Sequence, residues 1–191
     1  MCSPVENLPR LGSRFGIDLR VKRDDLLALS GGGNKVRKGL RIVAEAEAAH
    51  ATALVTTGGL QSNHARVTAL LAAARGWRCS LVLHGAPGAL DDPKGNLLLM
   101  RLAGAEITIC DPEEISGHLE AAMQRLRDAG ERPYLVPGGG HCLAGALAYA
   151  EAITEVQAQL DGWIPDWIVH ASGTGATQAG ILAGCARAGW D

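Results

Sequence analysis

The sequence predicts an α/β protein built on a mainly parallel sheet. Short apolar runs with the length of strands alternate along the chain with alanine- and leucine-rich runs that are long enough for helices. Turns of small residues follow several of the apolar runs and lead directly into a helical run. Because a helix placed between two strands returns the chain to the same end of the sheet, this alternation favours parallel strands.

The predicted elements follow one another in a regular order. Strands are predicted at residues 17–22, 53–57, 78–84, 106–110, 133–136 and 167–170. Helices are predicted at residues 35–49, 62–75, 94–103, 114–129, 142–160 and 177–188. The stretches 85–93 and 161–165 carry the glycines and prolines typical of linkers, and the second is a candidate crossing between two domains.

The composition favours small-molecule chemistry. The 191 residues are 47% hydrophobic and 20% charged, as in an ordinary soluble globular protein, and the formal net charge is −2. Charges of both signs are interspersed, so neither a nucleic-acid-binding face nor a membrane-binding segment is predicted. The five cysteines are widely spread and suggest neither a disulfide framework nor a metal site. We expect a cytoplasmic protein.

A lysine at the mouth of a glycine turn is the most informative position. Lys35 follows Gly32, Gly33 and Asn34 and stands where a helix is predicted to begin. An amine must be neutral to form a Schiff base, and burial together with the positive end of the helix dipole would lower the pKa of this lysine. The alternative is an ordinary solvated lysine in the first turn of a helix.

Two further turns carry polar residues at predicted helix starts. Gln61, Ser62, Asn63 and His64 follow the second strand, where Ser62 or Asn63 could simply cap the helix and His64 could be a structural histidine. The segment from Ser172 to Thr177 offers glycines, hydroxyl groups and a following helix, which suits a phosphate dianion. It matches neither the dinucleotide fingerprint nor the P-loop, and a plain tight turn is the alternative.

Together with Lys22-Arg23-Asp24-Asp25, these motifs resemble the fold-type II pyridoxal-phosphate enzymes, and within them the D-cysteine desulfhydrase and 1-aminocyclopropane-1-carboxylate deaminase family. The resemblance runs from about Leu19 to the last residue. It implies three-layer αβα architecture with parallel sheets, similar to the tryptophan synthase β subunit. It also implies a larger cofactor domain that includes residues 1–45 and 163–191, and a smaller α/β domain at residues 46–162.

The same resemblance implies a role for each motif. Lys35 would form the Schiff base with pyridoxal 5'-phosphate, with Asn34 beside it. Ser62 would contact the substrate carboxylate or transfer a proton, and Asn63 would bind the phenolic oxygen of the cofactor. The residues implied to bind substrate are Gln61, Ser62, Asn63 and His64. The residues implied to bind phosphate are Ser172, Gly173, Thr174, Gly175, Ala176 and Thr177.

The implied reaction is β-elimination from a small amino acid, foremost D-cysteine, to give pyruvate, sulfide and ammonia. The run from His84 to Gly88 favours this branch over the deaminase branch, which remains an alternative together with a cysteate sulfo-lyase. His141 stands where relatives usually carry serine after the glycines of residues 138–140. Relatives imply a homodimer.

The segment at residues 172–177 is called the phosphate loop below. The chain stops at Asp191, one predicted helix beyond this loop, where family members continue. We therefore expect an incomplete larger domain that needs a missing C-terminal portion. Two alternatives follow: a truncated, catalytically inert module that still binds pyridoxal phosphate, and a protein that binds a phosphate ligand through residues 172–177 alone.

Overall fold

The computed structural model describes residues 2–29 and 31–190. Its strands are β1 (Val5–Asn7), β2 (Arg20–Lys22), β3 (Ala53–Gly59), β4 (Arg78–His84), β5 (Glu106–Cys110) and β6 (Pro133–Leu135). Its α-helices are α1 (Pro9–Phe15), α2 (Asn34–Ala48), α3 (Asn63–Ala73), α4 (Gly95–Leu102), α5 (Ile115–Asp128), α6 (Leu143–Gln159) and α7 (Ala176–Ala188). Short 3₁₀ turns lie at Asp24–Leu26, Pro87–Leu90, Pro112–Glu114 and Gly138–Gly140.

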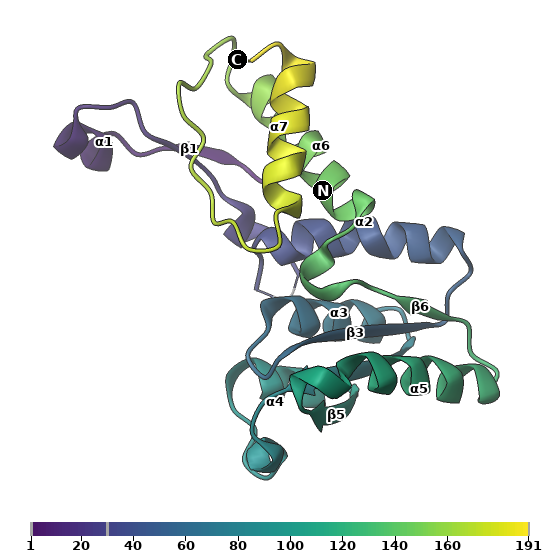
Figure 1. The fold of residues 1–191 in the computed structure, drawn as a ribbon. Coiled ribbons are helices and arrows are strands. Elements are labelled where there is room, and N and C mark those ends of the chain that lie inside the picture. Colours follow the sequence, from purple (N-terminus) through teal and green to yellow (C-terminus); the bar gives the residue numbers. More distant parts are fainter. Residues whose placement is uncertain (1, 30, 191) are drawn as a thin grey trace.

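A four-stranded parallel sheet in the order β5-β4-β3-β6 forms the lower half of the molecule in Figure 1. Successive residues of β3 alternate between its two faces, as the pleat requires. Val55 packs with Leu126 of α5 on one face, and Leu54 belongs to the core formed with α3 and α4 on the other. Helices thus cover both faces of the sheet, which confirms the predicted three-layer αβα arrangement.

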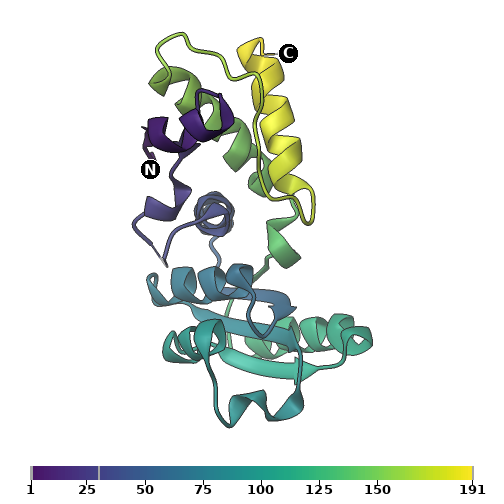
Figure 2. The same ribbon diagram turned by 90° about the vertical axis from the view of Figure 1, so that its left-hand side faces the viewer.

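The upper half is mainly helical and also contains the two-stranded sheet of β1 and β2. Helix α2 packs against α3 below and α6 above, and Figure 2 shows it nearly end-on between the two halves. Helix α7 packs closely against α6 because small residues face the contact. A Cβ atom added to Gly180 would lie 2.1 Å from the Ala146 carbonyl oxygen, and one added to Gly184 would lie 2.7 Å from Cβ of Ile153. Larger side chains at either position would push the two helices apart.

The N-terminal region departs from the prediction. The strand expected at residues 17–22 is only three residues long, and it pairs antiparallel with β1, which the alternating pattern did not predict. Helix α1 connects the two strands and projects from the body of the molecule in Figure 1. At three residues, β1 is too short for a two-residue-period apolar pattern to be recognised, so only its pairing with β2 reveals it.

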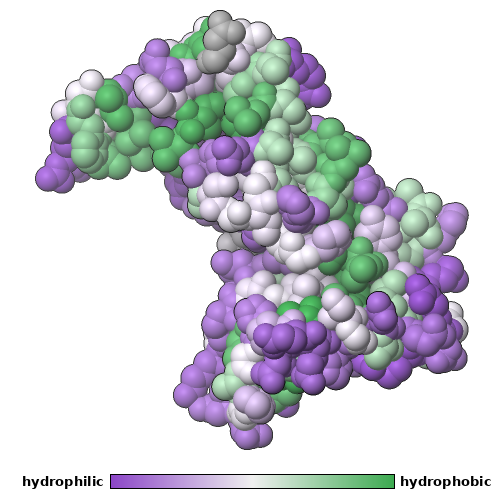
Figure 3. All heavy atoms as spheres, in the orientation of Figure 1, coloured by the Kyte–Doolittle hydropathy of each residue, from purple (hydrophilic) through white to green (hydrophobic). Residues whose placement is uncertain are grey.

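The prediction of a strand at residues 167–170 is wrong. This segment has no regular secondary structure, and no backbone hydrogen bond joins residues 164–174 to any described strand. Trp167 is 88% exposed and Val169 is 95% exposed. A strand exists only when its N–H and C=O groups are paired across a ladder, so the correct apolar pattern is not sufficient here. Figure 3 shows apolar side chains at the surface around this segment and α7.

No helix in the described part of the chain combines the length and the apolar character needed to cross a membrane.

Candidate active site

The glycine turn that precedes Lys35 places the amine of this lysine beside a second glycine turn, at residues 138–140. Gly33, with φ of +95°, precedes the first residue of α2, Asn34, so that Lys35 lies in the first helical turn. The Lys35 Nζ donates to the carbonyl oxygen of Gly139 at 3.3 Å. Burial lowers the pKa of the Lys35 amine below its ordinary value. The structure therefore favours the neutral form of this amine more than water does.

A second lysine, which the sequence analysis did not single out, shares this carbonyl. Lys38 is only 2% exposed, and its Nζ donates to the same Gly139 oxygen at 3.4 Å. No carboxylate among the described residues lies within salt-bridge distance of it. Burial, and then the neighbouring charge of Lys35, lower the pKa of Lys38 to about 8. An unpaired buried lysine is costly, and it marks a place suited to an anion.

The glycine turn at residues 138–140 also touches the predicted phosphate loop. Gly139 has a φ of +67°, and a Cβ atom built on it would lie 2.9 Å from Cγ2 of Thr174. Helix α7 starts directly after Gly175, and no side chain in the described part of the chain caps its N-terminus. Its first N–H groups are therefore free to bind an anion. Lys35, Lys38 and the loop at residues 172–177 thus meet around Gly139.

Within this loop the predicted residues differ in their surroundings. Ser172 is exposed, and its hydroxyl donates at 3.1 Å to Oε1 of Gln178, a residue of α7. Gly173 is exposed, whereas Ala176 and Thr177 are buried at the start of α7. The loop therefore presents the backbone N–H groups at the start of α7, and the Thr174 side chain lies against Gly139.

The start of α3 is held by its own hydrogen bonds. Ser62 caps this helix, because its Oγ accepts from the N–H of Ala65 at 3.1 Å. The Oδ1 of Asn63 accepts from Nδ2 of Asn96 at 3.1 Å. The side chain of Gln61 accepts from the backbone N–H of Asn96 and donates to the carbonyl of Lys94. Gln61 thus ties the turn before α3 to the start of α4.

His64 points into the protein rather than toward solvent. It is 5% exposed, and its Nε2 lies 2.9 Å from Oγ1 of Thr56. The Thr56 hydroxyl donates its single proton to the carbonyl of Val136, so it must accept from Nε2–H of a neutral imidazole. Burial, and then the charges of Lys35 and Lys38, lower the pKa of His64 to about 4.

The depressed pKa of His64 predicts a loss of stability in acid. The unfolded chain takes up this proton near pH 6.5, whereas the folded chain takes it up only near pH 4. The free energy of unfolding should therefore fall by about 3 kcal/mol from this residue as the pH drops through that window. His64→Gln should remove this component in urea denaturation curves recorded from pH 7 to pH 4. His141→Gln, at an exposed position, should keep the wild-type dependence of the free energy of unfolding on pH. The same dependence on pH in all three proteins would contradict the prediction.

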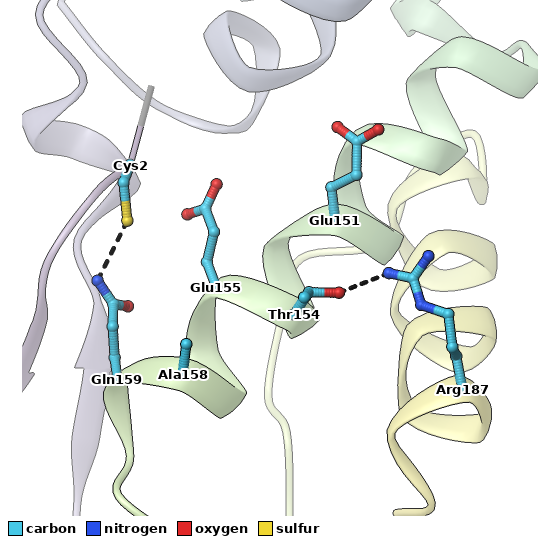
Figure 4. Close-up of a pocket in the computed structure, with 7 residues that line it drawn as sticks. All are labelled: Cys2, Glu151, Thr154, Glu155, Ala158, Gln159 and Arg187. Carbon is cyan, nitrogen blue, oxygen red and sulfur yellow. Dashed lines mark hydrogen bonds between the residues drawn. The ribbon is translucent and has the colours of Figure 1, made fainter.

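A separate groove of about 610 Å³ lies between the N-terminal segment, α6 and α7. Figure 4 shows Cys2, Glu151, Glu155, Gln159 and Arg187 around it. None of the predicted site residues lines this groove. The candidate active site is instead the place where the turn before Lys35, the turn at residues 138–140 and the loop at residues 172–177 meet.

A family model described as "Pyridoxal-phosphate dependent enzyme" matches residues 2–191. The chain belongs to this family. Membership confirms the predicted family and its cofactor, pyridoxal phosphate. The chain is 42% identical over 185 residues to a Thermotoga maritima protein provisionally named as a 1-aminocyclopropane-1-carboxylate deaminase. That match covers 95% of this chain and 58% of the relative.

Solved structures of several other proteins have the same fold. The crystal structure of a homologue of 1-aminocyclopropane-1-carboxylate deaminase superimposes on this chain with a TM-score of 0.88 and 35% identity. The match covers all of this chain and 58% of the homologue. A fungal L-serine ammonia-lyase from Rhizomucor miehei gives 0.76 with 18% identity, over 100% of this chain and 56% of that one. A mutant of O-ureido-L-serine synthase gives a TM-score of 0.72 with 20% identity, and the match covers 97% of this chain and 56% of that one. The chain thus spans slightly more than half the length of these relatives.

The described residues fit the family's cofactor. A phosphate ester needs positive charge and free N–H donors, which the buried Lys38 and the start of α7 offer on two sides of Gly139. An aldehyde needs an amine of lowered pKa, which Lys35 offers. Beside the same turn, Thr57 Oγ1 is buried without a hydrogen-bond partner among the described residues. A ligand group or water at this site would satisfy it.

Proposed function

We propose that this pyridoxal-phosphate-dependent enzyme is a lyase or deaminase of small amino acids, with Lys35 as its cofactor-binding lysine. One observation carries the proposal: the Lys35 amine, with its lowered pKa, lies at Gly139, which also contacts Thr174 of the phosphate loop. We assign residues 1–45 and 163–191 to a larger cofactor domain and residues 46–162 to a smaller one.

Lys35 has two tasks in this proposal. Its neutral amine would hold the cofactor through the aldehyde carbon, with Asn34 beside it at the start of α2. When it is not holding the cofactor, the same amine would remove the α-proton of the substrate as a general base. The cofactor, when bound, supplies an electron sink for the charge that proton removal leaves on the substrate. A base with a pKa lowered by burial suits this work near neutral pH.

Lys38 and the loop at residues 172–177 hold the phosphate. A lysine ammonium is a compact point charge. No described carboxylate pairs with the buried Lys38 amine, so a bound phosphate would be its charge partner. Ser172, Gly173, Thr174 and Gly175 lead into α7, whose first N–H groups begin at Ala176 and Thr177. The helix dipole favours negative charge at this end.

The start of α3 faces substrate in the proposal. Ser62 and Asn63 remain our candidates for the substrate carboxylate and the cofactor's phenolic oxygen, because backbone donors at a helix start suit anionic oxygens. Ser62 keeps a hydroxyl proton for donation, since its bond to Ala65 uses only an oxygen lone pair. The side chains of Gln61 and His64 are engaged in structural hydrogen bonds, so we place them behind this contact surface.

For the substrate we favour D-cysteine, from which sulfide leaves the β-carbon after α-proton removal. The second candidate is 1-aminocyclopropane-1-carboxylate, because two of the relatives described above are named for its deaminase. A cysteate sulfo-lyase would use the same elimination. We further propose a cytoplasmic homodimer.

The test is a visible absorption spectrum of the protein with pyridoxal phosphate, before and after each candidate substrate. A band of the lysine-bound cofactor, followed by sulfide and pyruvate from D-cysteine, is the expected result. A four-carbon oxo acid from the cyclopropane substrate would instead favour the deaminase. A stable band without turnover would support an inert cofactor-binding module, and the absence of any band would contradict the proposal.

A further inference from the structure

A buried ionic network lies on the side of α2 opposite Lys35. Arg37 follows Lys35 by two residues, so its side chain leaves the helix about 200° further around the axis. Arg37 is 7% exposed. Its Nε and Nη2 donate to Asp24 at 3.0 and 2.8 Å, and its Nη1 and Nη2 donate to Glu155 at 2.8 and 3.0 Å. One guanidinium therefore holds two carboxylates from different parts of the chain.

Asp24 is the best-connected member of the network. Besides Arg37, its Oδ1 accepts from the hydroxyl of Ser3 at 2.7 Å and its Oδ2 from the hydroxyl of Tyr149 at 2.8 Å. Burial opposes ionisation of Asp24, but the hydrogen bonds from Arg37 and Ser3 outweigh it and hold the pKa of the carboxyl below its ordinary value. Both carboxylate oxygens are thus fully used within the protein.

The main chain at Asp24 also holds the glycine turn before Lys35. The N–H of Gly33 donates to the Asp24 carbonyl oxygen at 2.7 Å. A Cβ atom on Gly32 would lie 2.1 Å from the carbonyl oxygen of Asp25, so the turn is pressed against this backbone. Asp24 therefore contacts α2 twice, once just before it begins and once through Arg37, and fixes how the helix is turned about its axis.

Helix α6 supplies the other side of the network. Glu155 also pairs with Lys22 at 2.9 Å, and Figure 4 shows Glu155 and Gln159 leaving α6 toward the segment that carries Cys2. The network contains two cations, Arg37 and Lys22, and two carboxylates, so it is neutral as a whole. Buried ion pairs are weak evidence for stability but suit the selection of one geometry.

We propose that Asp24, Arg37 and Tyr149 are positioning residues that set the rotation of α2 and thereby aim the Lys35 amine at Gly139. The inference rests on the proposed function of Lys35. A helix rotated by even a small angle would move the end of a lysine side chain by an ångström or more, which is enough to spoil a reacting geometry.

The test measures which lysines pyridoxal phosphate labels. Wild type and variants are incubated with it and reduced with borohydride, and the labelled peptides are quantified by mass spectrometry. The readout is the ratio of label at Lys35 to label at Lys94, whose side chain is 78% exposed. Asp24→Asn should lower this ratio about tenfold, and Tyr149→Phe, which removes only a hydroxyl, about fivefold.

The matched control is Glu151→Gln, which changes a carboxylate of α6 that pairs with Arg41 of α2 at the surface. Its ratio should stay within about twofold of wild type. Circular dichroism shows that each variant is folded at the labelling temperature. An unchanged ratio in folded Tyr149→Phe and Asp24→Asn would overturn the positioning role. A wild-type ratio near one would instead overturn the assignment of Lys35, and this inference with it.

Discussion

Lys35→Ala is expected to abolish the visible band of the lysine-bound cofactor. Among the described residues, the amines of Lys35 and Lys38 both contact Gly139, and of these two only Lys35 lies in the first turn of α2. In a preparation that turns over, the same variant should lose about 10²- to 10⁴-fold in rate, the usual contribution of a general base. The checks are an absorption titration with pyridoxal phosphate and an assay for sulfide and pyruvate.

Two other lysines provide the comparison for this experiment. Lys94→Ala alters a surface lysine that pairs with Asp92, and it should keep both the band and the rate. Lys38→Ala should keep the band but require more pyridoxal phosphate to form it, because it removes charge from the phosphate side of Gly139. A band of wild-type strength in Lys35→Ala would show that another amine binds the cofactor.

Gly139→Ala should weaken the binding of pyridoxal phosphate by about 10- to 100-fold. The added methyl group would meet Thr174 at 2.9 Å and push the phosphate loop away from the two lysines. The positive φ of Gly139 adds a backbone cost of roughly 1–2 kcal/mol for any residue with a Cβ. Dissociation constants from the absorption titration measure the first effect, and urea denaturation measures the second.

The chain offers a control that separates clash from backbone strain. Gly104 also has a positive φ, +76°, but nothing lies within 4 Å of a Cβ atom built on it. Gly104→Ala should therefore lose a similar amount of stability and bind pyridoxal phosphate as wild type does. If Gly139→Ala and Gly104→Ala bind the cofactor equally well, the contact with Thr174 has no part in the site.

Much of the fold was predictable because it depends on local patterns. Strands β4 and β5 have the predicted bounds, and helices α2 to α7 begin and end within two residues of prediction. These elements have clear periodicity and clear ends, such as Ser62 at the start of α3. The pattern failed at residues 167–170, where strand formation depends on a neighbour that the segment itself does not encode.

The candidate site divides in the same way. Lys35 and the loop at residues 172–177 could be found from the sequence, because a lysine or a phosphate loop at a helix start is a local signature. Lys38 could not, because nothing distinguishes it from a surface lysine until α6 and the Gly139 turn bury it. The orientation of His64 likewise depends on Thr56 and Val136.

The sequence by itself determined the order of the elements from α2 to α6, the family and the lysine to test, because these rest on periodicity and on motifs of a few consecutive residues. Only the tertiary structure decided that Gly139 joins Lys35 to the phosphate loop, and that Asp24 and Arg37 hold the other side of α2. These contacts join residues far apart in the chain. Distance, burial and charge partner are properties of the folded chain, and no local pattern records them.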